Sequence, residues 1–314
     1  MAPRHPGAGD WLRLLGLTAC WGSAFLFNEV ALAALPPPVI VSGRIVLGGL
    51  LLLGYARASG MPLPRSLADW APMVVIALFG VLVPFYLTVW AQVHLPSAAT
   101  AVLMSVMPLF VMILAHVFIP GERLSAAKIG GFVVGFSGVV LVIGPESAAR
   151  ADGMTIIASL AALAAAFSYS ATSIYSRLNA RAEPLSMAAG MLLVAAVIAV
   201  PVAAAGNIPG PADLTLPALA SVAILGIFAT GVASVLYFQV ISGPGPTFLS
   251  LVNYMVPAWG VVLGVFVLDE RLTPWAFAGL GLVLVGIAIS EFGHRWQLAR
   301  ATIHAQSHVD TQSL

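Results

Sequence analysis

Two ionisable side chains, Glu29 and Arg44, lie inside long apolar stretches of the sequence. A charge in apolar surroundings is costly, and it is usually paired or functional. Arg44 carries a planar guanidinium suited to binding a carboxylate, and Glu29 carries a carboxylate that can take up a proton. Two alternatives remain open: the residues form an ion pair with each other, or Glu29 reaches out to a polar interface.

A second set of candidates consists of polar and aromatic residues near the middle of apolar stretches. A binding cavity combines an apolar wall with a few aimed hydrogen-bonding groups, and these residue types supply both. The alternatives are an interfacial aromatic belt and hydrogen bonds between neighbouring helices. Together with Glu29 and Arg44, the candidate binding residues are Trp21, Asn28, Tyr86, Ser168, Tyr169, Tyr237, Asn253 and Tyr254.

The chain that must position these residues has the composition of a membrane protein. Of its 314 residues 60% are hydrophobic and 8% charged, and the mean hydropathy is +1.02. A soluble domain carries roughly 25% charged residues. The single cysteine, Cys20, excludes a disulfide within the chain and a thiolate metal site. The net charge of +1 gives no bulk attraction to nucleic acid, and no phosphate-binding Gly-Lys-Ser/Thr loop is present. We therefore expect no nucleic-acid partner, no cofactor and no enzymatic activity.

Apolar runs of about 20 residues, long enough to cross a bilayer, predict an all-α membrane protein with ten transmembrane helices. Their weak alternation excludes a transmembrane barrel. The first run is too long for a signal peptide and is interpreted as a retained span. The predicted spans are about 11–34, 38–56, 70–91, 97–119, 126–144, 154–176, 185–205, 216–240, 246–268 and 275–292.

The distribution of positive charge predicts the orientation. Lys and Arg gather in the segments on one side of the predicted spans, whereas Arg150 and Arg271 lie on the other side. Cytoplasmic loops are the ones enriched in Lys and Arg. We therefore expect a multi-pass protein of the cell inner (plasma) membrane with both termini in the cytoplasm.

The sequence repeats itself at a distance of 148 residues. Glu-Arg-Leu at 122–124 recurs at 270–272, and the same offset relates two pairs of glycines, Gly131 with Gly279 and Gly138 with Gly286. Because each half holds five predicted spans, an odd number, the second half is expected to be inverted relative to the first. The expected organisation is a five-helix repeat at 1–148, an inverted repeat at 149–292 and a polar cytoplasmic tail at 293–314.

Five spans per half, Trp21-Gly22 in the first span, and a proline-bearing span followed by Glu-Arg-Leu and a glycine-rich span resemble the EamA-type transporters of the drug/metabolite transporter superfamily. The resemblance covers about 11–292. It implies ten helices, cytoplasmic termini, and export or exchange of small metabolites such as amino acids. The second half has Tyr169-Ser170 where the first has Trp21-Gly22. Equal contributions of the two halves to a site are therefore not expected.

These observations predict a secondary transporter whose halves rock around a cavity lined by the first, third, fourth, sixth, eighth and ninth spans. Pro108 and Pro257 occupy corresponding places in the fourth and ninth spans, and paired helix interruptions point to a transport pathway. We therefore expect both prolines to act as helix breaks in gating. The expected partners are the lipid bilayer and a small-molecule substrate, with the chain a monomer or homodimer. The alternative is a membrane scaffold or accessory subunit that transports nothing, which a dry, fully packed bundle would favour.

Overall fold

The fold was determined as a computed structural model that describes residues 6–61, 66–122, 124–150, 153–179, 184–206 and 209–290. Within these ranges all regular structure is helical and no strand occurs. An α-helix satisfies its backbone hydrogen bonds internally, as a segment surrounded by lipid requires. The all-α prediction is confirmed for this part of the chain. The predicted tail at 293–314 lies outside the described residues.

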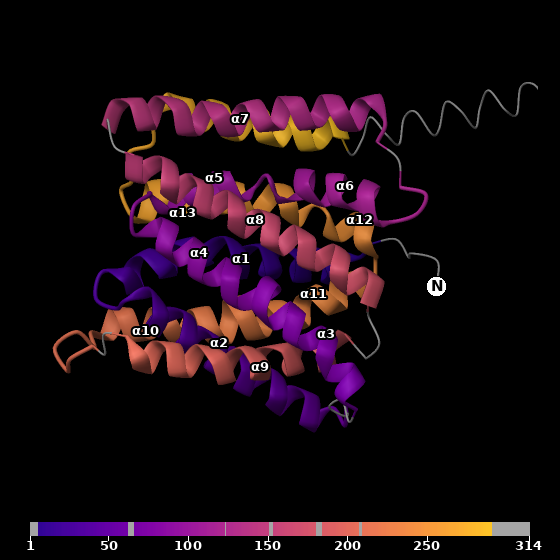
Figure 1. The fold of residues 1–314 in the computed structure, drawn as a ribbon, viewed down its shortest axis with the longest axis vertical. Coiled ribbons are helices and arrows are strands. Elements are labelled where there is room, and N and C mark those ends of the chain that lie inside the picture. Colours follow the sequence, from indigo (N-terminus) through magenta and orange to yellow (C-terminus); the bar gives the residue numbers. More distant parts are fainter. Residues whose placement is uncertain are drawn as a thin grey trace, which may run out of the picture.

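The helices follow one another with short connections (Figure 1). Two of them, η1 and η2, are π-helical. The elements are α1 (Ala8–Leu32), α2 (Pro37–Ala58), α3 (Leu67–Ala77), η1 (Leu78–Leu82), α4 (Val83–Gln92), α5 (Ser97–Met104), α6 (Met107–Phe118), α7 (Ala126–Arg150), α8 (Gly153–Asn179), α9 (Pro184–Ala205), α10 (Leu216–Gly226), η2 (Ile227–Val232), α11 (Ala233–Ser242), α12 (Pro246–Leu249), α13 (Val252–Val267) and a last described helix, Pro274–Ser290.

Eight helical stretches in the described ranges are long and apolar enough to cross a membrane. Two further apolar helices, Val252–Val267 and Pro274–Ser290, are shorter. Large apolar side chains on the outside of the bundle are strongly exposed, among them Leu50 at 60%, Val197 at 76% and Phe266 at 78%. Apolar surface of this extent suits lipid rather than water. The chain is therefore a multi-pass membrane protein, and the count of ten spans stays a prediction.

The π-helical segments occupy corresponding places in the two halves. η1 joins α3 to α4 within the third predicted span, and η2 joins α10 to α11 within the eighth. They begin at Leu78 and Ile227, 149 residues apart. A π-segment is rare, shifts the register of a helix and is frequent at functional sites. The third and eighth predicted spans therefore share a π-helical segment at the same place along the helix.

The fourth and ninth predicted spans are each interrupted. In the fourth, α5 ends at Met104 and α6 begins at Met107, so that Pro108 is the second residue of the new helix. A proline fits there because the first-turn N–H groups have no helical partner. In the ninth span the break precedes Val252, the first residue of α13, and Pro257 lies inside that helix. The interruption therefore falls several residues before Pro257 rather than at it.

The helices pack in pairs that have counterparts in the two halves. α1 packs on α13, α10 and α11, while α8 packs on α5, α6 and α4. α2 and α9, which correspond to the second and seventh predicted spans, pack against each other. α7 and the helix Pro274–Ser290 lie together along one side of the bundle (Figure 1).

Glycines let α7 and the helix Pro274–Ser290 cross at backbone contact. A Cβ atom added at Gly138 would lie 2.6 Å from the carbonyl oxygen of Gly279. A Cβ added at Gly131 would meet the carbonyl oxygen of Gly286 in the same way. Because Gly131 corresponds to Gly279 and Gly138 to Gly286, the 148-residue offset exchanges one contact for the other.

Candidate functional site

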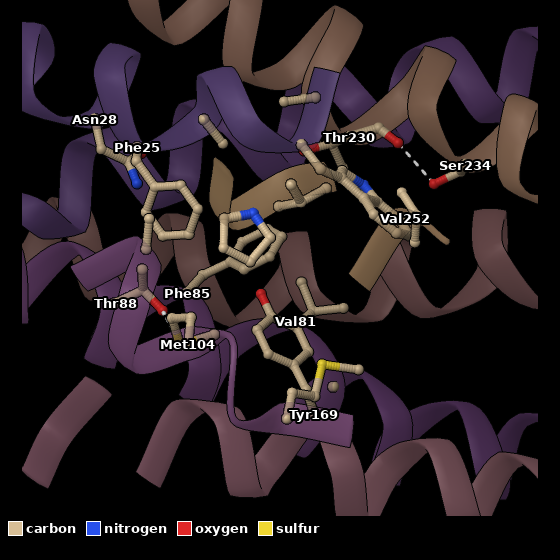
Figure 2. A pocket seen from close by; sticks show the side chains of 18 of the residues that line it. Phe25, Asn28, Val81, Phe85, Thr88, Met104, Tyr169, Thr230, Ser234 and Val252 are labelled. Atoms are coloured by element: carbon tan, nitrogen blue, oxygen red, sulfur yellow. Dashed lines mark hydrogen bonds between the residues drawn. The ribbon is translucent and has the colours of Figure 1, made fainter. Parts of the chain in front are cut away.

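A cavity of about 300 Å³ lies in the middle of the bundle (Figure 2). Its walls come from α1, α2, η1, α4, α5, α6, α8, α9, η2, α11 and α13, so both halves contribute. The six predicted spans all take part. The expectation of six was incomplete, because α2 and α9 also reach the cavity, through Arg44 and through Met191 and Leu192.

The candidate residues divide into two groups. Those that line the cavity are Trp21, Asn28, Arg44, Pro108, Tyr169, Asn253 and Pro257. Those that lie outside its lining are Glu29, Tyr86, Ser168, Tyr237 and Tyr254.

Arg44 is held in the cavity wall by two contacts, one with Thr230 of η2 and one with Phe85 of α4. Its Nε donates a 2.8 Å hydrogen bond to Oγ1 of Thr230, and that hydroxyl donates to the carbonyl oxygen of Leu225 at 2.9 Å. The guanidinium carbon lies 3.9 Å from the centre of the Phe85 ring, a cation–π arrangement. Arg44 is 8% exposed, and no carboxylate of the described residues lies within ion-pair distance of it. The site therefore holds a positive charge without an anionic partner.

Aromatic side chains form much of the remaining wall. The Phe85 and Tyr169 rings lie edge to face with their centres 6.4 Å apart, and the Tyr169 hydroxyl points into the cavity (Figure 2). Trp21 lines the cavity from α1, and Tyr237 packs beside it, ring centres 5.8 Å apart. Tyr237 thus supports the wall instead of forming it.

Asn28 lines the cavity and is held by a chain of amide hydrogen bonds. Its Nδ2 donates to Oε1 of Gln92 at 2.9 Å, and Nε2 of Gln92 donates to the carbonyl oxygen of Phe25 at 2.8 Å. Because a carbonyl oxygen can only accept, this chain fixes the orientation of both amides. Asn28 Oδ1 is buried and has no hydrogen-bond partner among the described residues.

Glu29 lies on α1 next to Asn28 but outside the cavity lining. Its Oε2 is buried without a hydrogen-bond partner in the described part of the chain. No ion pair joins it to Arg44 among the described residues. The alternative of a Glu29–Arg44 ion pair is therefore wrong. Successive residues on an α-helix are turned by about 100°, so Asn28 and Glu29 face different surroundings.

The other candidates outside the lining are held by neighbouring helices. Ser168 Oγ donates a 2.5 Å hydrogen bond to the carbonyl oxygen of Phe79, which ties α8 to η1. The Tyr86 hydroxyl is buried without a partner among the described residues, and Tyr254 packs against the apolar cluster around Leu103. These side chains contribute to helix packing, the alternative that the sequence left open.

Glu270 joins the two halves at one end of the bundle. Its Oε1 accepts a 2.7 Å hydrogen bond from the backbone N–H of Ser97, and Oε2 accepts one of 2.9 Å from that of Ala98. A carboxylate at a helix N-terminus satisfies free N–H groups and complements the helix dipole. Glu270 therefore caps α5, which belongs to the other half of the chain.

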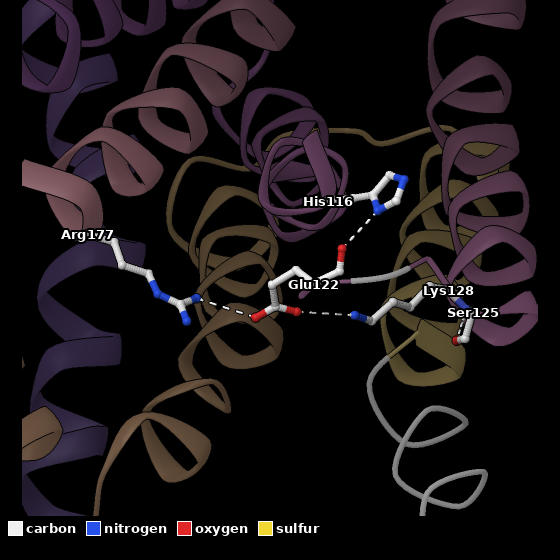
Figure 3. A network of polar contacts seen from close by, with 5 residues as sticks. All are labelled: His116, Glu122, Ser125, Lys128 and Arg177. Atoms are coloured by element: carbon white, nitrogen blue, oxygen red, sulfur yellow. Dashed lines mark hydrogen bonds and ion pairs between the residues drawn. The ribbon is translucent and has the colours of Figure 1, made fainter. Parts of the chain in front are cut away.

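Glu122, the counterpart of Glu270, makes different contacts. Its carboxylate forms ion pairs with Lys128 at 3.7 Å and with Arg177 at 3.5 Å, and its carbonyl oxygen lies 2.9 Å from Nδ1 of His116 (Figure 3). Residues that correspond in sequence therefore hold the two halves together in different ways.

The cavity also contains residues that the sequence did not single out, among them Thr230, Phe85, Thr88 and Met104. Their types are common in apolar helices and carry no local signal. The described residues contain no group of three or more His, Cys, Asp or Glu side chains arranged to hold a metal ion.

Comparison with known proteins identifies the family. The chain matches the EamA-like transporter family over residues 10–144 and again over 156–292. The chain belongs to this family. Similar proteins include an uncharacterized transporter of Archaeoglobus fulgidus, 26% identical over 89% of this chain and 97% of the relative. The inner membrane transporter YedA of Escherichia coli, also uncharacterized, is 24% identical over 89% of this chain and 90% of its own length.

A further relative has a more specific name. The "Probable terminal-alkyne amino-acid exporter" of Streptantibioticus cattleyicolor is 25% identical over 86% of this chain and 89% of its own. A solved structure, described only as the crystal structure of a protein, superposes with a TM-score of 0.65 and 22% identity. It covers 91% of this chain and 99% of that one, which shows a shared fold.

Proposed function

We propose that this EamA-like chain is a secondary transporter that exports or exchanges a small carboxylate-containing metabolite by alternating access. The observation that carries the proposal is the central cavity, in which Arg44 has no anionic partner among the described residues. A bundle that served only as a scaffold would gain nothing from a buried, unpaired charge. Amino acids remain among the candidate cargoes, because one relative is named an amino-acid exporter.

The proposed architecture is ten spans in two inverted five-helix repeats, 1–148 and 149–292. The paired π-segments and the exchanged glycine contacts between α7 and the helix Pro274–Ser290 support it. The two shorter apolar helices would complete the count. The charge bias of the loops supports cytoplasmic termini in the inner membrane, and a monomer suffices because one chain builds the cavity.

The unequal contacts of Glu270 and Glu122 support alternating access. If the two glutamates made the same contacts, both ends of the cavity would be closed to the same extent. Here Glu270 binds the first turn of α5, whereas Glu122 binds Lys128 and Arg177. We propose that such contacts form and break as the halves rock, and that Pro108 and Pro257, in the helices that follow the two interruptions, take part in the movement.

Flux through proteoliposomes tests the proposal. Purified protein is reconstituted, and uptake and efflux of labelled organic acids and amino acids are measured with and without a pH gradient. We expect saturable flux that Ser234→Trp, which fills the cavity, abolishes and that Leu50→Trp, on the lipid-facing surface, preserves. Absence of flux in protein that is demonstrably folded, or equal flux in the cavity-filled variant, would favour the scaffold.

A further inference from the structure

We propose that the cargo is an organic monoanion with an apolar or aromatic body, and that the cavity discriminates against zwitterions and cations. The proposal rests on the proposed transport function and specifies the cargo of the same site. It concerns the net charge of the ligand.

The charge of the cavity points to an anion. Arg44 is the one charged residue among the described residues that line it, and no Asp or Glu does so. Burial of an unpaired charge is costly, and an anionic ligand would compensate for it. Nε is engaged by Thr230, and no further hydrogen bond of the guanidinium is formed within the described residues. The terminal nitrogens can therefore bind a carboxylate in the two-pronged manner that arginine favours.

The second half supplies an apolar group where the first supplies the charge. Gly43-Arg44 corresponds to Gly190-Met191 at an offset of 147 residues, and each pair lies within a helix that begins with proline. Met191 also lines the cavity. A ligand that fits both halves therefore has an anionic head at Arg44 and an apolar body toward Met191.

The remaining wall of the cavity suits a flat apolar group. Phe85 and Tyr169 present aromatic rings, and Met104 adds a polarizable thioether. Thioethers and aromatic edges make favourable contacts with aromatic ligands. A phenyl ring attached to a short carboxylic acid is the simplest compound with both features.

An α-ammonium group would be poorly accommodated. It would lie a few ångströms from the guanidinium that binds the adjacent carboxylate, and no carboxylate of the described lining residues could neutralise it. A hydroxyl at the same position adds no positive charge. An α-hydroxy acid should therefore bind better than the α-amino acid of the same shape.

Four ligands that share a phenylethyl group provide the test: 3-phenylpropanoate, phenyllactate, phenylalanine and 2-phenylethylamine. Their dissociation constants are measured by titration calorimetry on the purified full chain in detergent. We expect both monoanions to bind, phenylalanine to bind at least about tenfold more weakly, a difference of about 1.4 kcal/mol, and the amine not to bind. Phenylalanine binding as tightly as phenyllactate, binding of the amine, or binding of none of the four would overturn the proposal.

Variants on one helix assign the effect to the cavity. Arg44→Gln should abolish monoanion binding, and Arg44→Lys should weaken it because lysine lacks the planar fork. Arg57→Gln removes the same charge from the exposed end of α2 and should bind like the wild type. Equal losses at both positions, or full binding by Arg44→Gln, would contradict the proposal. If neither Arg44 variant folds, the ligand series on the wild type still decides.

Flux of the same four compounds separates this proposal from the transport function. Monoanions that bind but do not cross proteoliposomes would contradict transport and leave the charge preference standing. Saturable flux of phenylalanine or the amine, with none of the monoanions, would support transport and overturn the charge preference.

Discussion

Replacing Glu270 by glutamine removes the contact that joins the loop after α13 to the start of α5. Both carboxylate oxygens accept backbone hydrogen bonds, from Ser97 at 2.7 Å and from Ala98 at 2.9 Å. Glutamine keeps one acceptor oxygen, replaces the other by an amide nitrogen that cannot accept, and carries no charge. One hydrogen bond is therefore lost, and the other becomes a neutral one.

The magnitude follows from the two changes. A hydrogen bond to a charged group contributes about 1.5–3 kcal/mol, and a neutral one about 1 kcal/mol. The negative charge at the helix N-terminus adds about 0.3–1 kcal/mol. Glu270 is only partly buried, and its contact with solvent reduces the free energies of these interactions. We expect Glu270→Gln to reduce the free energy of unfolding by about 2 kcal/mol.

The assay is unfolding in mixed detergent micelles by increasing SDS, followed by tryptophan fluorescence. Glu122→Gln is the matched control, because Glu122 corresponds to Glu270 but forms ion pairs at 3.5 and 3.7 Å with its side chain 36% exposed. Such pairs contribute about 0–1 kcal/mol. Equal losses in the two variants would refute the assignment of Glu270 as the stronger contact between the halves.

Two further substitutions test the helix crossing and the support of Arg44. Gly138→Leu should lower the free energy of unfolding by about 3 kcal/mol or prevent folding, because its side chain would collide with Gly279, and the same SDS titration measures this. Gly281→Leu, with no atom within 4 Å of an added Cβ, is the control, and equal effects would contradict the crossing. Thr230→Val removes the acceptor of Arg44 Nε and should weaken phenyllactate binding by about tenfold in calorimetry. Unchanged affinity would show that the hydroxyl does not orient the guanidinium.

The helices were largely predictable because each apolar run is the length that a bilayer requires. The predicted span 216–240, for example, corresponds to the continuous stretch α10–η2–α11, Leu216–Ser242. The π-segments inside such stretches were not predictable, because a register shift leaves hydrophobicity unchanged. The break before Val252 also lacked a signal, and Pro257, the residue expected to mark it, lies inside α13.

The candidate site was predictable where a residue type was itself unusual. Arg44 and Asn28 stand out in apolar helices, and both line the cavity. The position of a residue along an apolar run does not show which way its side chain faces. The Glu29–Arg44 ion pair was for this reason a wrong alternative. Thr230 lies 186 residues from Arg44 in the chain. No local pattern identifies such a partner, because the fold brings the two together.

The most direct test of the central claim is whether the cavity is reached from both sides of the membrane. Ser234 lines the cavity and is replaced by cysteine in a Cys20→Ser background, which contains no other thiol. Its labelling by a membrane-impermeant thiol reagent is measured from each side of oriented vesicles. Alternating access predicts labelling from both sides, with phenyllactate slowing both rates. Labelling from neither side, or from one side alone whether or not ligand is bound, would contradict the account.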